Sequence, residues 1–205
     1  MNKLTIDQFR AMLGAALTAV REKEEYFSQL DAVTGDGDHG TAIVTALNEA
    51  IAASGAASDF NAMFNDIGFG VMLKTSGSTS TLMGGFFLGM ADGSAGVEID
   101  AAQVKVMFRS GLEGVAKNTK ATIGDKTMMD ALLPAVEAIS LCSSEDIREI
   151  LSAGAAAALL GAAATVQMKA NFGRARNYGD RSIGTMDAGA ASWATMFGAF
   201  SKSLE

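Results

Sequence analysis

The chain has 205 residues, 49% of them hydrophobic, which is enough for one well-buried core, and no break in composition divides residues 1–205 into two domains. A net charge of −7 argues against nucleic acid and anionic membranes as partners, because both would repel it. The single cysteine excludes an internal disulfide, and the N-terminal sequence resembles no secretory signal. We expect a single-domain cytoplasmic protein with no membrane span.

One proline against many alanines and methionines favours helices over strands. In chain order, Thr5–Gln8 has capping-box spacing and opens a first helix whose apolar stripe runs to Val20. Seven more helices are predicted to begin near Thr41, Asp59, Ser78, Asp100, Asp125 or Thr127, Ser143–Asp146, and Asp187. The predicted fold class is all-α, a bundle of eight antiparallel amphipathic helices, with Pro134 kinking the sixth helix or restarting it.

One end of this bundle is predicted to be unusual. Short connections place the starts of the second, fourth, sixth and eighth helices at the same end. The loops there are GDGDHGT, TSGSTS, TIGDKT and RARNYGDRSIGTMDAGA. Helix N-termini attract anions, and small residues let a phosphate approach the backbone, so four such starts predict a phosphate site. The arginines before the last helix, Arg174, Arg176 and Arg181, are candidate phosphate clamps.

The loop LDAVTGDGDHGT carries Asp31, Asp36, Asp38 and the only histidine of the chain, His39, within nine residues. Each aspartate alone would pass for a cap or turn former. Together they would repel one another and any phosphate, unless divalent cations lie between the anions. Carboxylate oxygens are ligands that Mg²⁺ accepts alongside nucleotide phosphates. The loop therefore predicts a site for one or two Mg²⁺ ions beside a polyphosphate.

Other motif interpretations of these loops are weaker. Gly35–Gly40 matches G-x-G-x-x-G, but no strand precedes it and two of its variable positions are acidic. An EF-hand fails because Leu47 stands where the bidentate glutamate belongs. The GDKT stretch lacks the upstream glycine of a P-loop, so Lys126 is not a Walker lysine. For His39, a nucleotide contact is favoured over covalent phosphorylation, because it adjoins the acidic cluster.

Four motifs in register resemble the nucleotide-binding L subunit, or L domain, of dihydroxyacetone kinases: LDAVTGDGDHG, SGSTS followed by GGFF, GDKTMMD-x3-P, and GRARNYGDRSIGTMDAG. The resemblance covers nearly the full chain. It implies a barrel of eight antiparallel helices that binds ADP or ATP at one rim through two Mg²⁺ ions. The chain departs from the family pattern at Gly77–Thr81, where GGASG is common, and at Ala188, where a proline is common.

The resemblance also implies which residues form the site. The metal ligands would be Asp31, Asp36 and Asp38, and Arg174 would close over the nucleotide. The full set of implied nucleotide-binding residues is His39, Gly40, Thr41, Ala42, Thr79, Ser80, Thr119, Met128, Arg174, Asp187, Ala188 and Gly189.

For function, the resemblance implies a phosphotransferase subunit that is active only with a separate K subunit, which holds the short ketose on a histidine. Phosphoryl transfer of this kind needs no covalent side chain here, because the metals and phosphates are positioned for in-line attack. Stand-alone length and GDGDHG favour a member whose ADP is rephosphorylated in place by an M subunit of the bacterial phosphotransferase system. An ATP-dependent kinase of another ketose such as erythrulose, a non-catalytic regulatory module, a homodimer, and a hollow barrel with an apolar ligand stay open.

Overall fold

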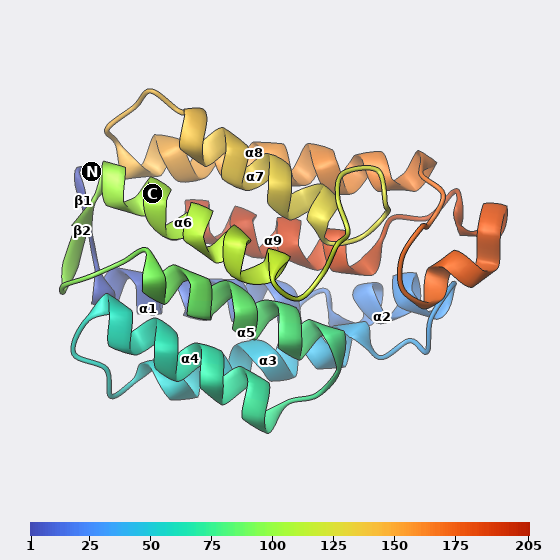
Figure 1. Ribbon diagram of the computed structural model, residues 1–205, viewed down its shortest axis with the longest axis horizontal. Helices are drawn as coiled ribbons and strands as arrows, with labels where there is room; N and C mark the ends of the chain where they lie inside the picture. Colours follow the sequence, from blue (N-terminus) through green and yellow to red (C-terminus); the bar gives the residue numbers. More distant parts are fainter.

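A computed structural model describes all 205 residues and shows an elongated bundle of helices (Figure 1). The eight predicted helices are confirmed as α1 and α3 to α9, and a ninth, α2, was not predicted. Two short strands and two 3-10 segments were also missed. The elements are β1 (Lys3–Thr5), α1 (Ile6–Arg21), α2 (Glu24–Ala32), α3 (His39–Ser54), α4 (Phe60–Lys74), α5 (Gly77–Asp92), β2 (Glu98–Asp100), α6 (Ala101–Ala116), α7 (Met129–Leu141), α8 (Ile147–Ala164), η1 (Thr165–Gln167), η2 (Arg174–Ser182) and α9 (Ala188–Lys202).

Side-chain caps explain most helix starts. Thr5 and Asp100 form capping boxes with the residue three positions on, and Asp59, Asp146 and Asp187 each accept a backbone N–H of the first turn. The sixth predicted helix, α7, begins later than expected. Its start is delayed because the Asp130 carboxylate accepts the N–H groups of Gly124 and Thr127 and folds the preceding loop back on the first turn.

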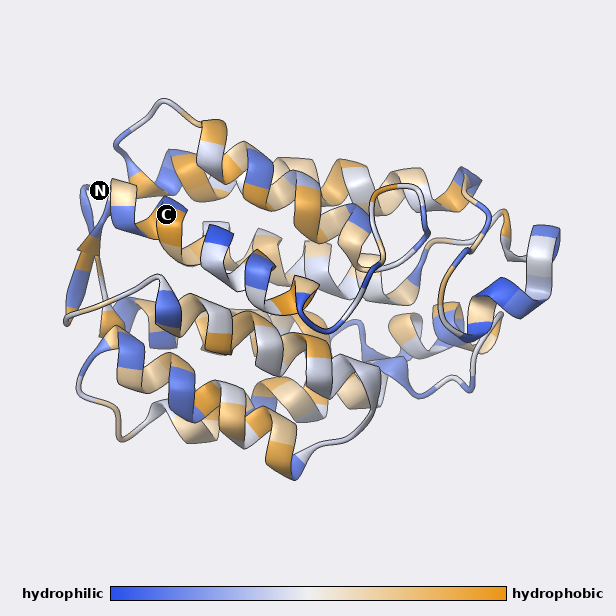
Figure 2. Cartoon of the chain, viewed as in Figure 1, coloured by the Kyte–Doolittle hydropathy of each residue, from blue (hydrophilic) through white to orange (hydrophobic).

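From α2 onward, helices that follow one another in the chain pack side by side, whereas α1 packs against α3. Helix α9 closes the ring by contacting both α8 and α1. Nearly the whole surface of α9 is buried. Its aromatic side chains reach across the barrel, since Phe200 lies 5.8 Å from Phe9, and Trp193 lies 5.1 Å from Phe86 between ring centroids. The barrel axis is therefore filled by a continuous apolar core, while hydrophilic residues gather in the connections at its ends (Figure 2).

The packing of α5 against α6 depends on glycine. A Cβ at Gly114 would lie 2.1 Å from the Gly85 carbonyl oxygen, and one at Gly89 would lie 2.2 Å from the Ser110 carbonyl oxygen. The two backbones are thus in direct contact, a distance that any larger residue would prevent. This contact fixes the position of α5, whose N-terminus faces the predicted site.

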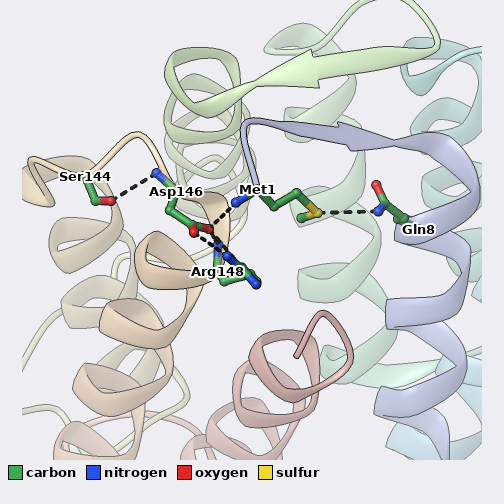
Figure 3. Close-up of polar contacts among 5 residues, drawn as sticks. All are labelled: Met1, Gln8, Ser144, Asp146 and Arg148. Carbon is green, nitrogen blue, oxygen red and sulfur yellow. Dashed lines mark hydrogen bonds and ion pairs between the residues drawn. The ribbon is translucent and has the colours of Figure 1, made fainter.

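The end of the barrel opposite the predicted site is fastened by the first residues of the chain. Strand β1 pairs antiparallel with β2, and the α-amino group of Met1 lies 2.7 Å from Asp146 Oδ1 (Figure 3). Arg148 pairs with the same carboxylate, and these two cations hold the pKa of Asp146 well below its usual range. The contacts join the region before α1 to the start of α8, at the end that carries no candidate chemistry.

One stretch, Ile147–Gln167, is apolar and long enough to cross a membrane by length and composition alone, although no membrane span was expected. A third of its apolar window is buried in the protein (33%). It packs against α7 and α9, and Gly161 touches α7 so closely that a Cβ there would lie 1.9 Å from the Asp130 carbonyl oxygen. Packing within the barrel thus accounts for the buried third of this window, whereas Leu159 and Leu160 are exposed.

Candidate functional site

The starts of α3, α5, α7 and α9 lie at the end of the barrel opposite the β1–β2 pair (Figure 1). Residues at these starts line one cavity of about 560 Å³. The acidic loop before α3 and the segment around Arg174 complete its wall. This confirms the prediction that four glycine-, serine- and threonine-rich loops share one rim. Each helix N-terminus carries a partial positive charge, so four of them around a common space make the cavity suitable for a polyanion.

The acidic loop is wrapped around Asp31, which lies near the end of the unpredicted helix α2. Asp31 Oδ2 accepts the N–H of Gly37 at 2.8 Å, and a Cβ at Gly35 would lie only 2.5 Å from Asp31 Oδ1. Gly37 has a φ of 77°, a conformation that favours glycine. These contacts bring carboxylate oxygens of Asp31, Asp36 and Asp38 within 4.8 Å of one another.

The charges of this cluster are unbalanced within the protein. Loss of solvent raises the pKa of Asp38, and the neighbouring charges of Asp36 and Asp31 raise it further. The pKa of Asp36 is lowered, chiefly by its hydrogen bond with Arg174. Three hard oxygen donors with one guanidinium beside them fit a divalent cation such as Mg²⁺, which would relieve the repulsion among them.

His39 ties three helix starts together. Its Nε2 lies 2.8 Å from Ser192 Oγ on α9, and its Nδ1 lies 3.4 Å from Thr79 Oγ1 on α5. Because the Ser192 hydroxyl donates to the Gly189 carbonyl oxygen at 3.0 Å, the geometry assigns the hydrogen to Nε2 of the imidazole. Burial lowers the pKa of His39, so the ring is neutral at pH 7. Ser192 was not singled out by any sequence pattern.

Most of the predicted site residues line the cavity. They are Asp31, Asp36, Asp38, His39, Ala42, Thr79, Thr119, Met128, Arg174, Asp187, Ala188 and Gly189. The predicted residues Gly40, Thr41 and Ser80 lie outside its lining. Gly40 packs against the Glu24 carbonyl oxygen, Thr41 donates to the Glu24 carboxylate, and Ser80 donates to a carbonyl oxygen of α4. The side chains of Thr41 and Ser80 are therefore engaged with neighbouring helices instead of the cavity.

The start of α9 is held in a buried setting. Asp187 Oδ2 accepts the N–H of Ala190 at 2.8 Å, and the Asp187 N–H donates to Thr165 Oγ1 at 2.9 Å. Burial raises the pKa of Asp187 to about 6. Gly189 fits closely against the start of α7, since a Cβ there would lie 3.2 Å from Met128 Cβ. The Asp-Ala-Gly sequence, with alanine at 188, therefore still caps α9 and packs against the start of α7.

The cavity also has an apolar part that the motifs did not predict. Alongside Met128, its lining includes Leu82, Phe172, Met186 and Trp193. Such side chains suit the flat face of a nucleobase. Of the three candidate arginines, Arg174 lines the cavity and pairs with Asp36, whereas Arg181 lies over the Tyr178 ring, 5.4 Å from its centroid.

Known proteins share this sequence. The DAK2 domain matches residues 33–202. The chain is 34% identical over 180 residues to the ADP-binding subunit DhaL of the PEP-dependent dihydroxyacetone kinase 1 of Listeria innocua, covering 87% of this chain and 86% of the relative. It is 33% identical over 175 residues to the corresponding Escherichia coli subunit, with 83% of each chain covered. It is also 33% identical to the D-erythrulose kinase of Mycolicibacterium smegmatis, of which it covers 32%.

A solved structure shares the fold. The crystal structure of the dihydroxyacetone kinase from C. freundii in complex with AMP-PNP and Mg²⁺ matches with a TM-score of 0.70 and 25% identity, over 95% of this chain and 33% of that longer one. The domain match, the relatives and the fold agree with the four motifs and with the rim cavity. The chain therefore belongs to the DAK2-domain family of dihydroxyacetone kinases and their ADP-binding DhaL subunits.

Proposed function

We propose that this protein is the nucleotide-binding subunit of a kinase for dihydroxyacetone or a related short ketose. It binds ADP or ATP with two Mg²⁺ ions and transfers a phosphoryl group to a ketose held by a separate K subunit. The observation that carries the proposal is the cavity in which four helix starts face three clustered carboxylates. Relatives named as ADP-binding subunits, and a structural neighbour that holds AMP-PNP and Mg²⁺, support it.

We infer a task for each part of the cavity lining. Asp31, Asp36 and Asp38 would hold the metals, which when bound neutralise phosphate charge. First-turn N–H groups would bind the phosphates, and neutral His39 would hold the starts of α3, α5 and α9 together beside them without adding charge. Met128 and its apolar neighbours receive the base, and Arg174 moves from Asp36 to the phosphates. No side chain of this protein becomes covalently modified.

We further propose that ADP stays bound and is rephosphorylated in place by an M subunit of the phosphotransferase system, in the cytoplasm, with no role for nucleic acid or a membrane. The support is that relatives over nearly the whole chain are named as PEP- or PTS-dependent, including one from Lactococcus lactis. The alternative is direct use of ATP, which the identity to erythrulose kinases supports. Stoichiometric ADP that survives gel filtration is expected for the first and excludes the second.

The test of the main proposal is calorimetry on protein stripped of endogenous ligand. ADP should bind in the presence of Mg²⁺ and bind far more weakly in EDTA. In a reconstituted system with the K subunit, Asp36→Asn should abolish ketose phosphorylation while the subunits still associate. Absence of any Mg²⁺-dependent ADP binding would refute the proposal, and unchanged transfer by Asp36→Asn would leave a non-catalytic module as the better description.

A further inference from the structure

We propose that Lys126 is a positioning residue that holds the start of α9 against the start of α7 and so sets the width of the nucleotide cavity. Lys126 lies in the GDKT loop and was not assigned a task by its motif, because the loop is not a P-loop. The consequence for ADP rests on the proposed function. The hydrogen bonds of Lys126 do not depend on that function, since they are present in the protein without ligand.

The side chain of Lys126 joins three parts of the chain. The residue is 4% exposed, and its Nζ donates to the Thr165 carbonyl oxygen at 2.6 Å and to the Thr185 carbonyl oxygen at 2.5 Å. Thr165 follows the last turn of α8, and Thr185 lies two residues before Asp187, which caps α9. Thr165 also holds Asp187 directly, through its hydroxyl. One ammonium group therefore joins the end of α8 to the segment that leads into α9.

The charge of Lys126 is kept in this buried position by two carboxylates. Burial lowers its pKa, and the negative charges of Asp187 and Asp130 act in the opposite direction. Asp130 is itself 1% exposed and is satisfied by the N–H groups of Gly124 and Thr127, so it fixes the loop that carries the lysine. A buried ammonium without such neighbours would be costly, which means that the three residues act as one unit.

The backbone at Lys126 is strained. Its φ is 58°, and it is the only residue other than glycine with a positive φ. Glycine would adopt this conformation at no steric cost, whereas a lysine pays for it. Strain of this kind persists where the surroundings over-determine the conformation, often beside a functional site. The backbone conformation alone would favour glycine, so the hydrogen bonds of the side chain explain why a lysine occupies this position.

The hydrogen bonds of Lys126 affect two residues that line the cavity. Gly189 on α9 and Met128 before α7 are in contact, and both belong to the proposed nucleotide-binding set. Releasing Thr185 and Thr165 from Lys126 would let the start of α9 move away from Met128. The phosphates and the base would then lose contacts on one wall, while the acidic loop on the opposite side stays in place.

The test compares Lys126→Met, which keeps the stem and removes the amine, with Lys126→Arg, which keeps the charge and donors. Lys120→Met is the matched control, because Lys120 lies in the same loop but is exposed. Hydrogen exchange is measured on ligand-free protein at Gly184, Asp187 and Ala190, whose N–H groups are hydrogen-bonded. In Lys126→Met we expect about tenfold faster exchange there or more, with the amides of α3 unchanged.

The same variant should weaken ADP binding in Mg²⁺ by about tenfold, with partial recovery in Lys126→Arg and no change in Lys120→Met. Unchanged exchange at the start of α9 would overturn the proposal, and so would a uniform increase at every helix start, which indicates general destabilisation. If Lys126→Met does not fold, Lys126→Gly removes the amine together with the strain and should show the same local pattern. If the wild type binds no ADP, the proposed function fails but the exchange result still decides this one.

Discussion

At the scale of single residues, each carboxylate of the acidic loop is held differently. Asp31 accepts a backbone N–H, Asp36 pairs with Arg174, and Asp38 is raised in pKa by its neighbours. In the proposed metal site, Asp31 would therefore be a rigid ligand, Asp36 would have to exchange Arg174 for a metal, and the negative charge of Asp38 would be opposed until a cation binds. This division is the physical basis of the predictions for individual side chains.

Replacing Asp38 with asparagine should weaken Mg²⁺-dependent ADP binding by at least about tenfold, because a ligand is lost from the metal site. The melting temperature of the metal-free protein should stay the same or rise, since one of three mutually repelling charges is removed and Asp38 makes no side-chain cap bond to α3. Calorimetry and thermal unfolding in EDTA measure the two effects. Asp66→Asn, at an exposed position on α4, is the control and should change neither.

Ser192→Ala should destabilise the protein by about 1 kcal/mol, because the half-buried imidazole of His39 loses the acceptor for its Nε2 hydrogen. Affinity for ADP should fall as well, since His39 and the start of α9 are no longer joined. Urea unfolding with calorimetry checks both. Ser152→Ala, at an exposed position on α8, is the control. If both variants have the same stability and the same affinity for ADP, the hydrogen bond between Ser192 and His39 does not contribute to either.

The Asp187→Asn variant tests how the carboxyl group that caps α9 makes the stability of the protein depend on pH. The pKa of Asp187 in the folded protein, about 6, lies above the ordinary aspartate value of 3.8, so the folded state binds a proton more tightly and Asp187 lowers stability as the pH rises. Asparagine can still cap α9 but does not titrate. The stability of Asp187→Asn relative to wild type should increase by about 2 kcal/mol between pH 4 and 6 and stay level above that. A flat difference across this range would mean that Asp187 titrates normally.

At the scale of elements, the sequence pattern did not predict α2, although this helix carries Asp31 of the candidate site. It has one fully buried apolar residue, Phe27, so its stripe is too weak to detect by periodicity. It is held instead by backbone contact, because a Cβ at Gly40 would lie 2.0 Å from the Glu24 carbonyl oxygen. This contact fixes α2 on α3, and with it the position of Asp31.

Gly40→Ala should therefore separate α2 from α3, with a loss of about 1–3 kcal/mol in stability and a marked loss of Mg²⁺-dependent ADP binding. Gly14→Ala is a matched control inside α1, where an added Cβ meets nothing within 4 Å. That substitution should raise stability by about 0.5–1 kcal/mol, because alanine favours helix. Chemical denaturation of both variants gives the comparison, and a stable Gly40→Ala with normal binding would contradict the packing account.

At the scale of the whole molecule, the aromatic side chains connect the barrel into one core that extends to the site. Trp193 lines the cavity and packs edge-on against Phe86, while α9 carries further rings to α1 and α6. We therefore expect residues 1–205 to unfold in a single calorimetric transition with equal calorimetric and van't Hoff enthalpies. Saturating ADP with Mg²⁺ should shift this single transition to a higher melting temperature without splitting it. Two separate transitions would contradict the single-domain prediction.

The sequence by itself determined the helical class, eight of the nine α-helices, and the end of the barrel at which the chemistry lies. Helix stripes, caps and glycine-rich loops are local patterns, so neighbouring residues encode them without knowledge of the fold. The three aspartates were also recognisable locally, because their repulsion within one loop demands a counter-charge. The delayed start of α7 was not, since it depends on how Asp130 folds its own loop.

Only the tertiary structure decided which side chains meet across the barrel. Ser192 reaches His39 from 153 positions away in the chain, and Lys126 reaches Thr165 and Thr185 from 39 and 59 positions away. Such contacts have no spacing rule, because the closing of the ring by α9 brings these residues together. The residue types of the site are therefore encoded in short local segments, whereas the dimensions of the cavity are set by long-range packing.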